Sequence, residues 1–154
     1  MRRAEKALTE TAEIEAILRT GRLCHLAFAA EPAPYIVTLN YGYAEGALYF
    51  HSAREGRKID LAVQDSKVGF SVALELKLLA AEQACGWTTR FQSVVGYGRL
   101  EFMATPEEKR LGLDRFMSHY TDESCSYPEK MIAKTAVYRL IIEEMSAKQS
   151  AAEE

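Results

Sequence analysis

The spacing of apolar and polar residues changes along the chain, from the period of a helix to the alternation of β-strands. Apolar side chains recur at helical spacing within residues 9–20, and the glycine that follows is a common helix stop. Residues 23–28 then alternate with a period of two, until the proline-rich segment 31–34 interrupts them. We therefore expect one helix followed by a first strand.

A hairpin and a second helix are expected next. Residues 35–43 and 47–52 both alternate, and a short turn with Gly46 separates them, which predicts two paired strands. A short helix that begins near Gly56 and a fourth strand over 67–74 follow.

The middle of the chain is ambiguous in one segment. Residues 75–86 fit either a helix or a long excursion loop, because their apolar positions allow both. Residues 88–103 form a long β-like run. Gly96 and Gly98 inside this run predict a bulge, or a bend such as a barrel corner.

The clearest local signal is the start of a later helix. Thr105 has the character of an N-cap, Pro106 occupies the first helical position, and Glu108 completes a capping box. A short turn of helix is expected after the Tyr-Pro pair at 127–128, and a last strand over 136–142.

Together these segments predict a mainly β fold with flanking helices, in which about six strands form a small antiparallel barrel. The early strands are joined by short turns, which differs from the steady strand–helix alternation of a parallel sheet. Residues 1–145 form a single predicted domain. Residues 146–154 are small and polar, which is typical of a flexible tail.

Composition and charge narrow the functional classes. Hydrophobic residues make up 48% of the 154 positions, too many for a disordered chain, and the net charge of −3 argues against a nucleic-acid binder. No apolar run is long enough to span a membrane, and no secretory signal is recognisable. The three cysteines are widely spaced and predict no disulfide framework. We therefore expect a protein of the reducing cytoplasm.

One short segment concentrates groups that bind phosphate. Residues 49–58 run from a strand end, which carries His51 and Ser52, into a helix. The start of that helix carries Arg57 and Lys58. Backbone N–H groups at a helix start, a hydroxyl and two cations make a phosphate site, although a solvated helix face would carry the same charges. Taken alone, His51 is a general acid, a ligand contact or a structural residue at a strand end.

Other cofactor signals are weak. His25 lies inside a strand, which is typical of a structural histidine, and the three histidines are too far apart to predict a metal site. The glycines at 96 and 98 are not continued as a dinucleotide-binding fingerprint.

Four motifs, in the same order, resemble the FMN-binding split-barrel family of pyridoxamine 5′-phosphate oxidase relatives. They are PYIVTLNYGY at 34–43, LYFHSA at 48–53, GRK at 56–58 and CGWTTRFQSVVGYG at 85–98. Within that family, the chain most resembles the nitroimidazole-resistance branch, the 5-nitroimidazole reductases. The resemblance extends over residues 5–148.

The resemblance implies a six-stranded antiparallel split β-barrel that works as a homodimer, with FMN sites at the subunit interface. The residues that match the family's flavin contacts are Val37, Thr38, Leu39 and Asn40 along the ring edge, His51, Ser52, Arg57 and Lys58 at the ribityl phosphate, and Ser93 near the flavin. A phosphate dianion gains most from charge-assisted contacts, and a flat ring needs an apolar slot with a few edge hydrogen bonds.

The implied function is that of an FMN-dependent oxidoreductase. The flavin would take a hydride from NADH or NADPH and pass electrons to a small acceptor, such as a nitroimidazole or another nitroaromatic compound. His51 is the candidate polar or proton-donating group beside the flavin. A non-catalytic flavin or haem binding protein of the same fold stays open as the alternative.

Overall fold

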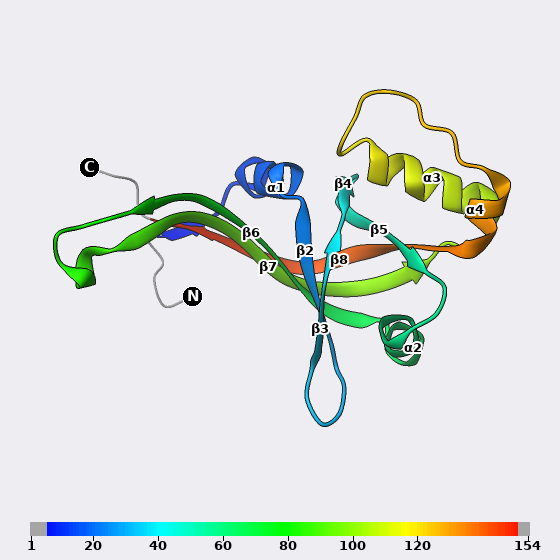
Figure 1. Ribbon diagram of the computed structural model, residues 1–154, viewed down its shortest axis with the longest axis horizontal. Coiled ribbons are helices and arrows are strands. Elements are labelled where there is room, and N and C mark those ends of the chain that lie inside the picture. The colour runs from blue at the N-terminus through cyan, green and yellow to red at the C-terminus, as the bar shows by residue number, and fades with distance from the viewer. Residues whose placement is uncertain (1–5, 151–154) are drawn as a thin grey trace.

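A computed structural model describes residues 6–150 as a curved antiparallel β-sheet with helices packed around it (Figure 1). The strands are β1 (Ala7–Leu8), β2 (Leu23–Phe28), β3 (Tyr35–Asn40), β4 (Gly42–Ala44), β5 (Ala47–Ala53), β6 (Lys67–Leu79), β7 (Thr88–Phe102) and β8 (Thr135–Gln149). The helices are α1 (Thr11–Thr20), α2 (Arg57–Gln64), α3 (Pro106–Met117) and α4 (Glu129–Lys134), with a 3₁₀ turn, η2, at Ala84–Gly86. The mainly β architecture with flanking helices is thus confirmed.

The strand order explains why the sheet curls. Neighbouring strands follow the order β3-β2-β6-β7-β8-β5-β4, and β1 pairs with β8 outside this path. The two edge strands, β3 and β4, are consecutive in the chain and only Tyr41 separates them. Because one residue cannot cross the width of a flat sheet, the sheet has to bend until its two edges lie side by side. Among the described strands the edges are not hydrogen-bonded to each other, so the barrel is split.

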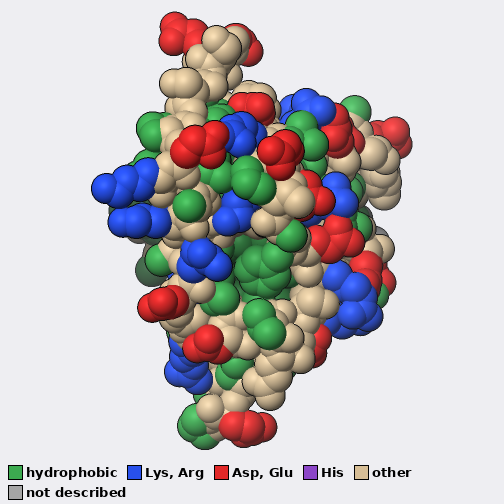
Figure 2. Space-filling view, turned by 90° about the vertical axis from the view of Figure 1, so that its right-hand side faces the viewer, with side chains coloured by type: hydrophobic (Ala, Val, Ile, Leu, Met, Phe, Trp, Pro, Cys, Tyr) green, Lys and Arg blue, Asp and Glu red, His purple; other side chains and the backbone are tan. Residues whose placement is uncertain are grey.

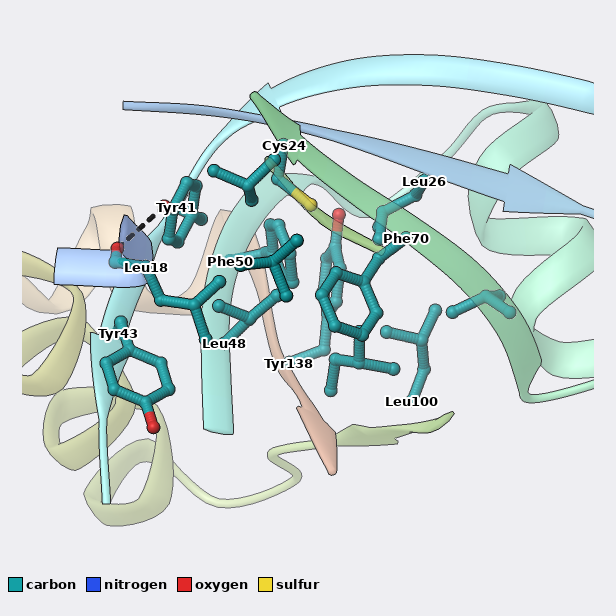
Figure 3. Packing of buried hydrophobic residues seen from close by; sticks show 14 of the residues in the cluster. Leu18, Cys24, Leu26, Tyr41, Tyr43, Leu48, Phe50, Phe70, Leu100 and Tyr138 are labelled. Carbon is teal, nitrogen blue, oxygen red and sulfur yellow. Dashed lines mark hydrogen bonds between the residues drawn. The ribbon is translucent and has the colours of Figure 1, made fainter. Parts of the chain in front are cut away.

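An apolar core fills the inside of the curl. Tyr41, Phe50 and Tyr138 are its largest fully buried side chains, and Figure 3 shows them close together with Leu48. The Tyr41 hydroxyl donates a hydrogen bond of 2.7 Å to the carbonyl of Leu18 at the end of α1. The residue that joins the two sheet edges is therefore fixed to both the core and a helix.

The number of strands differs from the six that the sequence predicts. β1 is additional, and the single strand expected over 35–43 is interrupted at Tyr41. Only β4 pairs with β5 in the predicted hairpin, whereas β3 pairs with β2 along its whole length. The interruption occurs where the chain passes from one edge of the sheet to the other. At Tyr41, whose side chain is buried, the chain stops pairing with β2 and starts pairing with β5.

Residues 75–86 form neither the helix nor the long loop considered from the sequence. β6 continues to Leu79 in register with β7, with a bulge between Glu75 and Lys77. The Trp87 indole N–H donates a hydrogen bond of 2.7 Å to the carbonyl of Ala81, which closes the loop between β6 and β7. The result is a hairpin arm that extends β6 and β7 past the rest of the barrel (Figure 1).

The predicted tail begins too early. The four residues from Ser146 to Gln149 are the end of β8, where Ala147 pairs with Val94 and is buried. Pairing on both sides, with β7 and with β1, holds this segment even though its residues are small and polar. Residues 151–154 of the predicted tail lie outside the described residues.

One local prediction is confirmed, and a second is confirmed in part. Thr105 accepts a hydrogen bond from the Glu108 N–H, and the Glu108 carboxylate accepts one from the Thr105 N–H, so α3 begins with a capping box. The register of β7 against β8 shifts between Tyr97 and Gly98, so an irregularity does occur at the interior glycines, but the extra residue of the bulge is Glu143 on β8.

Candidate functional site

The outer face of strands β3, β2, β6 and β7 is left open by the helices. Helices α1 and α2 contribute their buried side chains, including Ile17 and Ala62, to the core on the inner face. Helix α3 packs against β4, β5 and β8 instead. Apolar side chains on the open face are therefore exposed: Leu23 by 51%, Ile36 by 62% and Val95 by 46%.

The strand register aligns a row of side chains across this outer face. Thr38 lies opposite His25, His25 opposite Ser71, and Ser71 opposite Val95. Gly69, Ser71 and Ala73, the outward residues in the middle of β6, are small, so the face has a shallow depression there. A shallow, partly apolar surface with a few polar groups is suited to binding a planar ring.

Ser93 supplies an unusual polar atom on this face. Its neighbour Val94 is fully buried in the core, so strand alternation directs Ser93 outward. Ser93 lies in register with Ala73 and Lys148, and it is itself only 8% exposed. Its hydroxyl has no hydrogen-bond partner among the described residues. Buried polar atoms normally have partners, so this hydroxyl is suited to a ligand.

Strand β3 divides the four residues that the resemblance assigned to the ring edge. Thr38 and Asn40 are exposed on the outer face, whereas Val37 and Leu39 are half-buried against the core. Because β3 is an edge strand, backbone N–H and C=O groups along its free side have no strand partner within the described chain. These backbone groups are available to hydrogen-bond the edge of a ligand.

The predicted phosphate segment begins α2 as expected. Gly56 precedes the helix with φ 118°, a conformation that favours glycine, and no side chain caps the first turn. The Arg57 guanidinium lies 4.9 Å from the centre of the Tyr35 ring, which places the helix start against the beginning of β3. Neither Arg57 nor Lys58 forms an ion pair with another described residue. The first turn of α2 can therefore receive an anion.

His51 and Ser52 are not brought together by the structure. Successive residues of β5 point to opposite faces. The His51 ring meets the edge of Phe116 on α3, with ring centres 4.6 Å apart, and burial lowers the pKa of His51 below its ordinary value. Ser52 donates to the carbonyl of Ala53 instead. Within one chain, β8 lies between the strand of His51 and the strand of Ser93.

His25 and Ser71 are the site residues that sequence reasoning missed. His25 was expected to be structural, but it is exposed on the outer face between Thr38 and Ser71. A signal was present in β6, where small residues at 69, 71 and 73 alternate with larger apolar residues. Such an alternation predicts a strand with large side chains packed in the core on one face and only small side chains on the other.

Residues 6–150 contain neither a cluster of metal-binding side chains nor a membrane-spanning helix. No group of three or more His, Cys, Asp or Glu side chains in this range is placed to hold a metal ion. None of the helices described there has the length and apolarity needed to cross a bilayer.

Comparison with known proteins assigns the fold. The family model described as pyridoxamine 5′-phosphate oxidase matches residues 10–149. A solved structure from Bacteroides thetaiotaomicron, described as a candidate 5-nitroimidazole antibiotic resistance protein, is 31% identical with a TM-score of 0.82, over 93% of this chain and 86% of that one.

Two more distant structures share the fold. A protein from Mycobacterium smegmatis described as FAD and heme binding is 21% identical, with a TM-score of 0.85 over 96% of this chain and 74% of that one. The flavocytochrome Anf3 from Azotobacter vinelandii is 23% identical, with a TM-score of 0.85 over 99% of this chain and 72% of that one. A search of curated proteins gave no match. The chain therefore belongs to the pyridoxamine 5′-phosphate oxidase family and has its split-barrel fold.

Proposed function

We propose that this protein is an FMN-dependent oxidoreductase that transfers electrons from NADH or NADPH to a small acceptor, such as a nitroimidazole or another nitroaromatic compound. The observation that supports it most is the Ser93 hydroxyl, which is buried on the open outer face and has no partner among the described residues. Membership of the family and the 31% identity to the Bacteroides protein support the choice of cofactor and acceptor.

The residues of the open face fit a flavin. The small side chains of β6 leave room for a flat ring, and the free edge of β3 offers backbone groups to the ring edge. The Ser93 hydroxyl would gain the hydrogen bond that it lacks. Thr38 and Asn40 border the same surface, while Val37 and Leu39 anchor their strand to the core.

The ribityl phosphate belongs at the start of α2 in this proposal. Arg57 and Lys58 would donate charge-assisted hydrogen bonds, and the backbone N–H groups of the uncapped first turn would add to them. Ser52 lies near the end of β5, the strand that precedes α2 in the chain, and its hydroxyl would donate a further hydrogen bond to the phosphate. The contact between Arg57 and Tyr35 connects this phosphate end to β3, so ring and phosphate sites are continuous.

When bound, FMN supplies hydride and electron transfer, which protein side chains do not carry out. The chain's own residues bind the cofactor, orient its ring against the sheet and exclude water from one side of it. His51 is neutral near pH 7, because burial lowers its pKa, and a neutral imidazole can hold or pass on a proton.

The open face also supports a homodimer. Its exposed apolar side chains, Leu23, Ile36 and Val95, would be covered by a second copy, and the flavin would lie between the two copies. In a dimer, His51 of one copy could approach a flavin held by the other, which a single chain does not allow. All three cysteines are free, and we place the protein in the reducing cytoplasm.

Absorption spectroscopy of the purified protein, followed by identification of the small molecule released on heating, tests the cofactor. We expect a flavin spectrum and FMN in the supernatant, and then oxidation of NADH or NADPH that depends on an added nitroimidazole. A colourless protein that does not take up added FMN would exclude the proposal.

A non-catalytic flavin or haem binding protein is the second candidate. The exposed His25 on the outer face favours it, because a neutral imidazole can ligate haem iron. The same spectrum separates the two candidates, since bound haem gives a strong Soret band. A His25→Ala variant that retains that band would remove His25 as the ligand.

A further inference from the structure

A second hollow lies at the end of the barrel, away from the open face. It has a volume of about 220 Å³ and lies between α2, the junction of β7 with α3, and the start of β8. Ile59, Val63, Phe102 and Val137 contribute its apolar lining. Figure 2 looks at this end of the molecule and shows apolar side chains in a central hollow with basic side chains near it.

The apolar lining is unusually accessible. Val63 is 74% exposed and Phe102 is 39% exposed, although both belong to regular elements. A neighbouring hollow of about 280 Å³ shares Phe102 and Met103, and it is bordered by Leu111, which is 54% exposed. The two hollows therefore share an exposed apolar wall, which is typical of a binding surface.

Two cations line the same hollow and are held in place by α4. The Arg54 guanidinium donates to the carbonyl of Ala133 at 3.1 Å, and the Lys109 ammonium donates to the carbonyl of Ile132 at 3.2 Å. Each bond uses one N–H group, and further donors remain on both side chains. Neither cation has a carboxylate partner within the described chain.

The two carboxylates that border the neighbouring hollow, those of Glu101 and Glu108, are already engaged. Glu101 accepts two hydrogen bonds from Arg139, and Glu108 accepts the N–H groups of Ala104 and Thr105 in the capping box. Glu101 and Glu108 therefore do not pair with Arg54 or Lys109, and neither does Glu55, which lies beside Arg54. The hollow combines an apolar wall with two positioned cations.

We propose that this hollow is a binding site for a small apolar carboxylate, such as an aromatic acid. Its ring would lie against Phe102 and Val63, and its carboxylate would accept hydrogen bonds from Arg54 and Lys109. The site is distinct from the proposed flavin site, because Arg57 lines a separate hollow beside the turn between β2 and β3. It therefore does not depend on the proposed function.

Benzoate is a suitable probe, with benzamide as its uncharged counterpart. Titration of the full chain as purified is followed by the NMR signals of residues around Phe102 and Val137. We expect benzoate to shift them with a Kd on the order of 1 mM and benzamide to bind at least about tenfold more weakly. Shifts of equal size with both ligands would overturn the proposal.

A matched pair of variants tests the charge without touching the bonds to α4. Val63→Glu adds a negative charge at the rim of the hollow, while Val63→Gln has nearly the same shape without the charge. We expect the first to weaken benzoate binding about tenfold relative to the second, with benzamide unaffected by the difference. Equal benzoate affinities in the two variants would overturn the assignment. Lys109→Gln, checked for an unchanged melting temperature, should also weaken benzoate about tenfold.

Discussion

The phosphate end of the proposed flavin site depends on two adjacent cations, Arg57 and Lys58, in the first turn of α2. Replacing both with alanine removes the charge and leaves the helix, because alanine has the highest helix propensity. Arg57 is exposed and Lys58 is half-buried, and neither has a carboxylate partner among the described residues. Their loss should therefore affect a bound phosphate more than it affects folding.

The expected size of the effect follows from the number of charged hydrogen bonds lost. Such bonds contribute about 1.5–3 kcal/mol each, and the solvent exposure of Arg57 favours the lower end of that range. Two bonds at the lower end amount to about 3 kcal/mol, or about a hundredfold increase in the Kd for FMN. Quenching of flavin fluorescence during titration of the apoprotein measures this Kd directly.

Riboflavin and a second double variant complete the experiment. Riboflavin lacks the phosphate, so its affinity should be nearly the same for the original and the Arg57→Ala, Lys58→Ala proteins. Lys130→Ala with Lys134→Ala removes two exposed cations from α4 and should leave FMN binding unchanged. An FMN Kd unaffected by the loss of Arg57 and Lys58 would refute the phosphate assignment. Equal weakening of FMN and riboflavin would show a general disturbance of α2 instead.

Three further changes test the site and the fold. Ser93→Ala should weaken FMN binding about tenfold without lowering the melting temperature, because its hydroxyl has no partner in the described chain; a lower melting temperature would show that it has one. Thr105→Ala removes the N-cap of α3 and should reduce the free energy of unfolding in urea by about 1 kcal/mol, and an unchanged value would contradict the capping role. His119 accepts a hydrogen bond from the Tyr43 N–H at 3.2 Å and contacts the Gly21 carbonyl at 2.6 Å, and burial lowers the pKa of His119 below its ordinary value of 6.5. The unfolded chain therefore takes up the proton first, so this contribution to stability is complete above about pH 6.5 and falls as the pH is lowered towards the folded-state pKa. The urea concentration at the unfolding midpoint should therefore fall between about pH 7.5 and about pH 5.5, and it should fall less in His119→Gln than in the original protein. An equal fall in both proteins would exclude His119 as its source.

Several features could be predicted from sequence because they depend on residues close together in the chain. The capping box of α3 needs only Thr105 and Glu108, three residues apart. Gly56 before Arg57 and Lys58 likewise marks a helix start that needs a glycine conformation and carries two cations. Alternation of apolar residues was sufficient to predict most strands, since it records which face of each strand meets the core.

Other features depended on partners far away in the chain. Residues 75–79 continue β6 only because β7 pairs with them, and Ser146–Gln149 are ordered into β8 only by pairing with β7 and β1. Their own composition favours a helix or loop in the first case and a tail in the second.

The candidate site shows the same division. The sequence by itself was sufficient to predict the family, and it supplied the proposed phosphate segment and the residue types of the candidate site. Only the tertiary structure decided which of those residues share a face: it separated His51 from Ser52, placed Thr38 and Ser93 on one open surface, and added His25 and Ser71 to it. The physical reason is strand register, which aligns residues from segments that are distant in sequence and leaves the Ser93 hydroxyl buried without a partner among the described residues.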